Sequence, residues 1–174
     1  MQAKSIRMPK DHQVSQLDST GSSPHIIRLH GAWQYEPLAF TRWGPAGGES
    51  VDLPGDLPPT GTVKIPADWA ATLGPTFRGR VLYKRRFGRP SNLAQNERID
   101  LVLHKINGLA TITLNGNQLG ETKIGESACR FELTTLLLPR NELHIEVNLP
   151  QDSRDITAGG IVGKVYLEIY EVAR

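Results

Sequence analysis

Two tryptophans, Trp43 and Trp69, are the residues of this sequence whose type and setting best suit ligand binding. Both lie in stretches that lack the alternation of polar and apolar residues typical of strands, so we expect both in loops. An exposed indole beside polar groups can stack on the apolar face of a sugar ring. Each ring also has a purely structural interpretation, in which it closes one end of the protein core. Both interpretations stay open for both residues.

The sequence lacks the motifs of nucleophilic catalysis, metal binding, glycoside hydrolysis and phosphate binding. The sequence has no Gly-x-Ser-x-Gly elbow, no His-x-His or His-Glu-x-x-His spacing, and no carboxylate pair spaced for glycoside hydrolysis. Residues 159–164 lack the spacing of a phosphate loop. Cys129, beside Arg130, could be an activated thiolate, but a half-buried small residue at a turn is the simpler interpretation. The sequence therefore predicts no catalytic residues, no cofactor and no metal, although it leaves a structural calcium open.

Composition narrows the classes of partner and compartment. The 174 residues have the size of one domain, and 20 Lys and Arg against 18 Asp and Glu leave a charge of +2, with the basic residues spread along the chain. We therefore expect neither a nucleic-acid nor a membrane partner. No segment has the length of a signal peptide's apolar core or of a membrane span. The single cysteine excludes an internal disulfide and favours a reducing compartment, so we expect a cytoplasmic protein.

Residues 101–120, LVLHKINGLATITLNGNQLG, are the clearest guide to the fold that must position these side chains. Residues 101–104 alternate like a half-buried strand, and a second strand follows at 110–114. Asn115 and Gly116 then supply the two residues of positive φ that a type I′ hairpin turn requires. This segment predicts an antiparallel β protein.

The remaining chain is predicted to contain further short strands and no long helix. Residues 1–24 are expected to form a weakly ordered arm, which leaves 25–174 as a single domain. Residues 41–62, rich in Gly and Pro, predict a long surface loop, and residues 67–75 a single helical turn or an irregular loop. The other expected strands begin after residue 24 and are best marked at 25–30, 32–38, 63–66, 81–87, 143–149 and 165–170. About eight or nine strands favour an antiparallel β-sandwich, either jelly-roll or immunoglobulin-like.

The order of several short motifs resembles the N-terminal sugar-binding domain of glycoside hydrolase family two, the group of β-galactosidases, β-glucuronidases and β-mannosidases. The resemblance covers residues 29–169 and rests on Leu29, Gly31, Trp33, Pro66, Trp69, Gly79, Tyr83, Lys84, Arg85, Phe87, Leu114, Asn115, Gly116, Leu119, Gly120, Phe131, Asn141, Leu143, Gly160, Ile161, Val165 and Leu167. It implies an all-β fold, a galactose-binding-domain-like jelly roll.

The same resemblance implies binding without hydrolysis. The catalytic glutamates of the family lie on a separate (β/α)₈ barrel after this domain, and the sequence ends at Arg174 before any such region, so we expect no enzyme. In the galactosidase branch an Asn and an acidic residue of this domain reach the active site. The corresponding positions are Thr76 and Arg154, with Asp155 one residue later. These differences predict that the domain does not complete a galactosidase pocket.

Three functions follow as hypotheses. The first is a non-catalytic carbohydrate-binding module of weak affinity, whose expected ligand-binding residues are Trp43, Trp69, Thr76, Phe77, Arg78, Arg154 and Asp155. The second is a protein-interaction or homo-oligomerisation module on the same fold, with Trp43 as a buried anchor. The third is a separately encoded accessory domain of a β-galactosidase-like enzyme.

Overall fold

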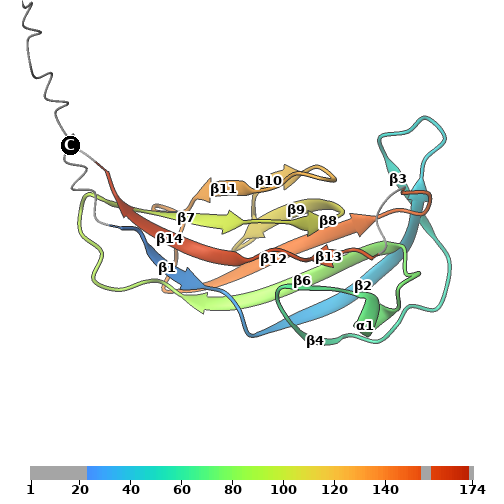
Figure 1. Cartoon of the computed structure of the whole chain (residues 1–174), viewed down its shortest axis with the longest axis horizontal. Coiled ribbons are helices and arrows are strands. Elements are labelled where there is room, and N and C mark those ends of the chain that lie inside the picture. Colours follow the sequence, from blue (N-terminus) through green and yellow to red (C-terminus); the bar gives the residue numbers. More distant parts are fainter. Residues whose placement is uncertain (1–22, 154–157, 173–174) are drawn as a thin grey trace, which may run out of the picture.

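Alternating apolar side chains build two antiparallel sheets whose inner faces share one core (Figure 1). A computed structural model describes residues 23–153 and 158–172. The seven-stranded sheet has the order β10-β9-β12-β6-β2-β3, with β4 also paired to β2. Its strands are β2 (Ala32–Trp43), β3 (Ser50–Leu53), β4 (Gly61–Lys64), β6 (Gly79–Gly88), β9 (Leu109–Leu114), β10 (Asn117–Thr122) and β12 (Arg140–Leu149). The expected arm, residues 1–24, lies almost wholly outside the described residues.

The four-stranded sheet has the order β1-β14-β7-β11. It consists of β1 (His25–Arg28), β7 (Glu97–Leu103), β11 (Cys129–Glu132) and β14 (Val165–Glu171). Three two-residue strands form a small sheet, β5 (Ala67–Asp68), β8 (Ile106–Asn107) and β13 (Gly160–Ile161). Helix α1 (Ala70–Leu73) is a single turn, as the sequence predicts for this region. None of the described helices is long and apolar enough to cross a membrane.

The strand with the strictest alternation lies near the middle of the larger sheet. The four inward residues of β12 have no exposed surface: Leu143, Ile145, Val147 and Leu149. Strand β12 pairs with β6 over its whole length, from Arg140 opposite Gly88 to Leu149 opposite Gly79. The strands expected at 143–149, 81–87 and 165–170 are present, and the all-β antiparallel sandwich is confirmed.

The turn between β9 and β10 has the predicted geometry. Asn115 and Gly116 have φ values of 51° and 84°, and Leu114 pairs with Asn117 directly across the turn. Strands β7 and β9 belong to different sheets, so residues 101–120 divide between the two larger sheets. The short β8 lies between them and pairs with β13.

Strand β7 differs from the half-buried strand that its alternation predicts. Val102 and Asp100, on its outer face, are only 4% and 3% exposed. The cause is the position of β7 between β14 and β11, where Arg130 lies opposite Val102 and its Nη1 lies 2.8 Å from Asp100 Oδ2. Long side chains of the neighbouring strands thus cover the outer face, which the sequence of β7 alone does not reveal.

The segment 41–62 is likewise not one loop. Strand β2 continues to Trp43, and β3 pairs back on it with Ser50 opposite Trp43. Thr41 is fully buried and donates its hydroxyl to Asn148 Oδ1 at 2.7 Å. Polar partners therefore hold this hairpin, which explains why apolar alternation does not mark it.

Strands β1 and β14, blue and red in Figure 1, lie side by side although they come from opposite ends of the described chain. Their register runs from His25 opposite Ile169 to Arg28 opposite Tyr166. Strand β1 is an edge strand of the smaller sheet.

Candidate functional site

The outer face of the seven-stranded sheet, called here the polar face, carries the side chains of β12 and β6 that do not enter the core. Cross-strand register places Glu142 opposite Arg86, His144 opposite Lys84, and Asn148 opposite Arg80. These alternate with the buried apolar residues of the same strands, and most keep intermediate exposure. The polar face therefore presents many hydrogen-bond donors and acceptors on a rigid sheet.

Ion pairs order the charged side chains of the polar face. Lys84 Nζ lies 2.7 Å from Glu36 Oε2, and Arg86 Nε lies 2.7 Å from Glu142 Oε2. Arg80 contacts two carboxylates, Asp52 at 3.0 Å and Glu146 at 3.4 Å. These pairs are partly exposed, so they contribute little to stability, but they fix the directions of groups that could meet sugar hydroxyls.

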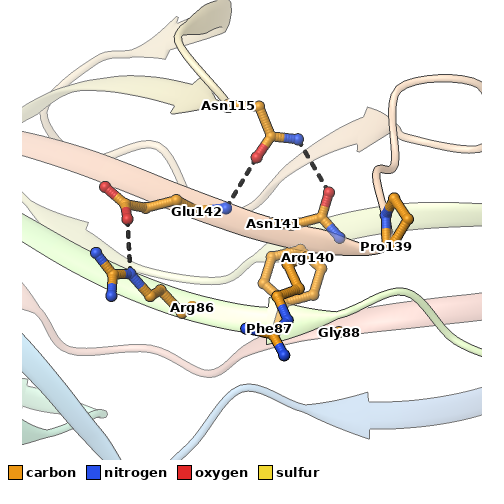
Figure 2. A pocket seen from close by; sticks show the side chains of 8 residues that line it. All are labelled: Arg86, Phe87, Gly88, Asn115, Pro139, Arg140, Asn141 and Glu142. Atoms are coloured by element: carbon orange, nitrogen blue, oxygen red, sulfur yellow. Dashed lines mark hydrogen bonds and ion pairs between the residues drawn. The ribbon is translucent and has the colours of Figure 1, made fainter.

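A hollow lies at the end of this sheet where β6 ends and β12 begins (Figure 2). It has a volume of about 620 Å³, and we call it the arginine hollow. Its lining combines two guanidinium groups, one carboxylate, one phenyl ring and two amides: Arg86, Phe87, Gly88, Asn115, Pro139, Arg140, Asn141 and Glu142.

Two side-chain amides fix the wall of the arginine hollow (Figure 2). Asn115 Nδ2 donates to Asn141 Oδ1 at 2.9 Å, and Asn115 Oδ1 accepts from the Glu142 amide at 2.9 Å. Asn141, only 2% exposed, also bonds both backbone groups of Leu138. Both amides are therefore engaged with protein partners, and Arg86, Arg140 and Glu142 supply the charged groups of the hollow.

Glu142 is held in its ionised form. Hydrogen bonds from Arg86 and then from His144 lower the pKa of its carboxyl below the usual range. His144 Nε2 lies 2.6 Å from Glu142 Oε1. The arginine hollow thus contains one carboxylate acceptor between cationic or polar neighbours.

A second hollow of about 370 Å³, the central hollow, opens beside β9 and β12. Arg80, Glu146 and Asn148 contribute polar side chains to it. Asn148 Nδ2 donates to Ser50 Oγ at 2.7 Å, and Ser50 lies opposite Trp43. Because Trp43 follows Thr41 by two residues on β2, its half-buried indole belongs to the same face as the Thr41 and Asn148 side chains.

The structure places Trp69 and Phe77 in the core. They are 1% and 5% exposed, and their rings meet edge-on with centroids 5.4 Å apart. A Cβ added at Gly159 would lie 2.1 Å from Trp69 Cζ2, so the backbone there closely covers the indole. Neither ring presents a face to a ligand in this structure, and the placement of Trp69 is the one that the core-plug interpretation describes.

The other residues expected to bind ligand are placed differently. Thr76 is exposed, and half-buried Arg78 donates from Nη1 to the Phe77 carbonyl at 2.8 Å. The structure brings Arg78 beside β2, where the Thr41 amide donates to the Arg78 carbonyl at 3.3 Å. Arg154 and Asp155 lie outside the described residues.

Several residues of the two hollows were not expected from the sequence, Arg86, Arg140 and Glu142 among them. The cationic run KRRFGR at 84–89 is the signal that could have revealed the arginine hollow. This run was overlooked because its cations belong to an alternating strand pattern and because the whole chain carries a net charge of only +2.

Cys129 shows no sign of activation. Burial, followed by the nearby Glu126 carboxylate, raises the pKa of its thiol to about 11. The thiol is therefore protonated at neutral pH, as a structural cysteine would be. Within residues 23–153 and 158–172, no three His, Cys, Asp or Glu side chains form a group that could hold a metal ion.

Comparison with known proteins gives one family and a set of similar structures. Residues 76–158 match the family model described as glycosyl hydrolase 2 galactose-binding domain-like. An FMN-binding β-glucuronidase from Faecalibacterium prausnitzii is 25% identical, with a TM-score of 0.63 over 84% of this chain and 22% of its own. Bifidobacterium dentium β-glucuronidase is 20% identical, with a TM-score of 0.66 over 86% of this chain and 30% of its own.

A putative β-galactosidase from Bacteroides fragilis gives similar values: 21% identity and a TM-score of 0.63 over 86% of this chain and 24% of its own. The chain therefore spans less than a third of the length of each of these three enzymes. No curated protein sequence matches the chain.

Proposed function

We propose that this chain, whose residues 76–158 match a galactose-binding-like domain of the glycosyl hydrolase 2 family, binds carbohydrate without hydrolysing it. The matched residues, 76–158, correspond to a binding-type domain rather than to a catalytic one. The proposal also agrees with the polar face, which offers donors and acceptors in fixed positions.

The observation that carries this proposal is the place of Trp43 on the polar face, opposite Ser50, whose hydroxyl accepts a hydrogen bond from Asn148 of the central hollow. A half-buried indole on a strand is already ordered, so stacking a sugar on it costs little conformational entropy. Arg80, Glu146 and Asn148 lie on the same face and are suited to bind hydroxyl groups. Apolar stacking beside several polar groups is the combination that a sugar ring requires.

The remaining residues of the expected ligand-binding set take different parts in this proposal. Arg78 lies beside β2, and Arg78 and Thr76 are proposed to extend the site, together with Arg154 and Asp155. Trp69 and Phe77 are proposed to support the site from the core side of the sheet. The Phe77 ring contacts the rings of both Phe40 and Trp69.

Saturation-transfer NMR tests the proposal with a panel of galactosides, glucuronides and mannosides. We expect transfer to at least one class and its loss in Trp43→Ala. Tyr166→Ala is the matched control, because Tyr166 is a half-buried aromatic on the other sheet. If the folded protein gave no saturation transfer to any sugar of the panel, the proposal would be overturned. Equal loss of transfer in Tyr166→Ala would also overturn it.

The absence of hydrolysis is tested separately. We expect no release of nitrophenol from 4-nitrophenyl β-galactoside, β-glucuronide or β-mannoside. Turnover that follows the protein through two unrelated purification steps would show that the chain is an enzyme.

A second candidate rests on the half-buried indole of Trp43, which a protein surface can cover as well as a sugar ring can. On this alternative the domain is an accessory or interaction module that docks on a partner or on itself, and Trp43 is an interface anchor. Light scattering of Trp43→Ala separates the two. Loss of an oligomer with sugar binding retained favours docking, whereas loss of sugar binding from a monomer favours the carbohydrate site.

A further inference from the structure

Positive charge is concentrated at the end of β6, although the whole chain carries only +2. Lys84 and Arg86 have carboxylate partners, Glu36 and Glu142. Arg89 and Arg140 are exposed, and neither forms an ion pair with any described residue. The end of this strand therefore carries more cations than its own carboxylates neutralise.

One of the two unpaired arginines, Arg140, lines the arginine hollow, and the other, Arg89, adjoins its lining residue Gly88. Arg140 begins β12 opposite Gly88, and the Arg89 amide donates to the Pro139 carbonyl at 3.2 Å. Gly88, Pro139 and Arg140 all line the hollow, and Arg86 reaches it from β6 (Figure 2). The guanidinium groups of Arg86 and Arg140 thus line one concave site of about 620 Å³, and Arg89 follows its lining residue Gly88 in the sequence.

We propose that the arginine hollow binds the acidic group of an anionic polysaccharide, a carboxylate or a sulfate. The planar fork of arginine donates two parallel hydrogen bonds to such groups, which a lysine cannot do. Phe87 gives the hollow an apolar wall, and Glu142 an ionised acceptor for hydroxyl groups. The site therefore recognises an acidic sugar unit rather than a bare anion.

Glu142 also argues against nucleic acid. Duplex DNA presents one phosphate per roughly 1.7 Å of its axis, and its recognition uses a long track of cations. Here the unpaired arginines are confined to one end of the sheet, with an ionised carboxylate among them. A chain of sugar rings with intermittent charges matches this pattern better than a continuous row of phosphates.

This inference goes beyond the proposed function, because it concerns the opposite end of β6 from Trp43 and a different ligand chemistry. Titration followed by ¹⁵N NMR keeps the two apart. The probes are a tetramer of galacturonic acid, the matching neutral galactose tetramer, inorganic sulfate and a short DNA duplex. We expect the acidic tetramer to shift the amide signals of residues 86–89 and 140–142, and its affinity to fall with added salt.

The decisive variant is Arg89→Gln with Arg140→Gln, because neither exposed side chain has an ion-pair partner among the described residues and the fold should persist. We expect its affinity for the acidic tetramer to fall at least about tenfold, as loss of charge-assisted hydrogen bonds predicts. Arg28→Gln with Lys64→Gln removes the same charge from exposed positions elsewhere and should bind normally.

Several outcomes would overturn the inference. Equal loss in the control pair would mean that net charge alone attracts the ligand. Sulfate, the neutral tetramer or DNA binding there as tightly as the acidic tetramer would overturn the assignment to acidic polysaccharide. A failure of Trp43→Ala to change neutral-sugar binding would count only against the proposed function.

Discussion

Asn115 and Asn141, 26 residues apart in the sequence, share a hydrogen bond of 2.9 Å from Nδ2 of the first to Oδ1 of the second. This bond ties the β9–β10 turn to the first residues of β12 and so forms the wall of the arginine hollow. Both residues belong to the short motifs from which the family resemblance was inferred. Their shared function in this chain is structural.

Asn141→Ala should lower the free energy of unfolding by about 3 kcal/mol, because it leaves the Asn115 amide and both backbone groups of Leu138 without their partner. Urea unfolding measures the change. Asn115→Gly is the companion variant, since glycine accepts the φ of 51° while losing the side-chain amide. A change below about 0.5 kcal/mol in Asn141→Ala would contradict this account.

Gly159→Ala should be among the most damaging single methyl additions in the chain. The new Cβ would lie 2.1 Å from Trp69 Cζ2, and a buried ring fixed by Phe77 cannot move away freely. We expect a loss of about 3 kcal/mol or failure to fold. Gly88→Ala is the control, because the nearest atom to its Cβ would be the Pro139 carbonyl oxygen at 3.9 Å. Thermal unfolding of the two variants makes the comparison.

Trp69→Ala should lower stability by about 3–5 kcal/mol, as removal of a fully buried aromatic side chain does. Loss of sugar binding in this variant would therefore report unfolding, and circular dichroism must accompany the binding assay. A folded Trp69→Ala protein of wild-type stability that no longer binds sugar would instead make Trp69 a ligand contact.

Cys129 should react slowly with iodoacetamide in the native protein. With its thiol pKa raised to about 11, its thiolate fraction at pH 8 is about a hundredfold below that of an unperturbed cysteine. Mass spectrometry of alkylated protein, with and without urea, measures the ratio. Similar rates in both conditions would show that the thiol is neither buried nor perturbed.

Glu142 should contribute to the dependence of stability on pH. Because its folded-state pKa lies below the ordinary value, its contribution is present above about pH 4.5 and is lost as the pH falls through the lowered value. Glu142→Gln should therefore be less stable than wild type at pH 7, with the difference shrinking towards pH 3. The effect should be small and salt-sensitive, since the side chain is 37% exposed. A difference that grows on acidification would contradict the assignment.

The parts of the fold that the sequence predicts best are those decided by local chemistry. The Asn115–Gly116 turn and the alternation in β12 follow from backbone preferences and from burial on one face. Strand β3 and the outer face of β7 were missed because their burial comes from neighbours distant in sequence. Asn148 binds the hydroxyls of Thr41 and Ser50, and Arg130 covers Val102.

The candidate site was harder to predict for the same reason. Trp43 and Trp69 look alike in the sequence, yet one is a half-buried strand residue on the polar face and the other is sealed in the core. Arg86 and Arg140 are 54 positions apart and meet only because β6 and β12 pair from end to end. Sequence spacing alone does not show which residues become neighbours across paired strands.

The neighbouring positions of β1 and β14 make this domain suitable for circular permutation. Because the first and last strands of the sandwich are adjacent, a short flexible linker should span the gap between them. New termini can open at Gly47–Gly48, in the exposed turn between β2 and β3, where no side chain lies within 4 Å of an added Cβ. In such a permutant the two strands would be joined locally, so their pairing would no longer require closure of a loop that now spans nearly the whole domain.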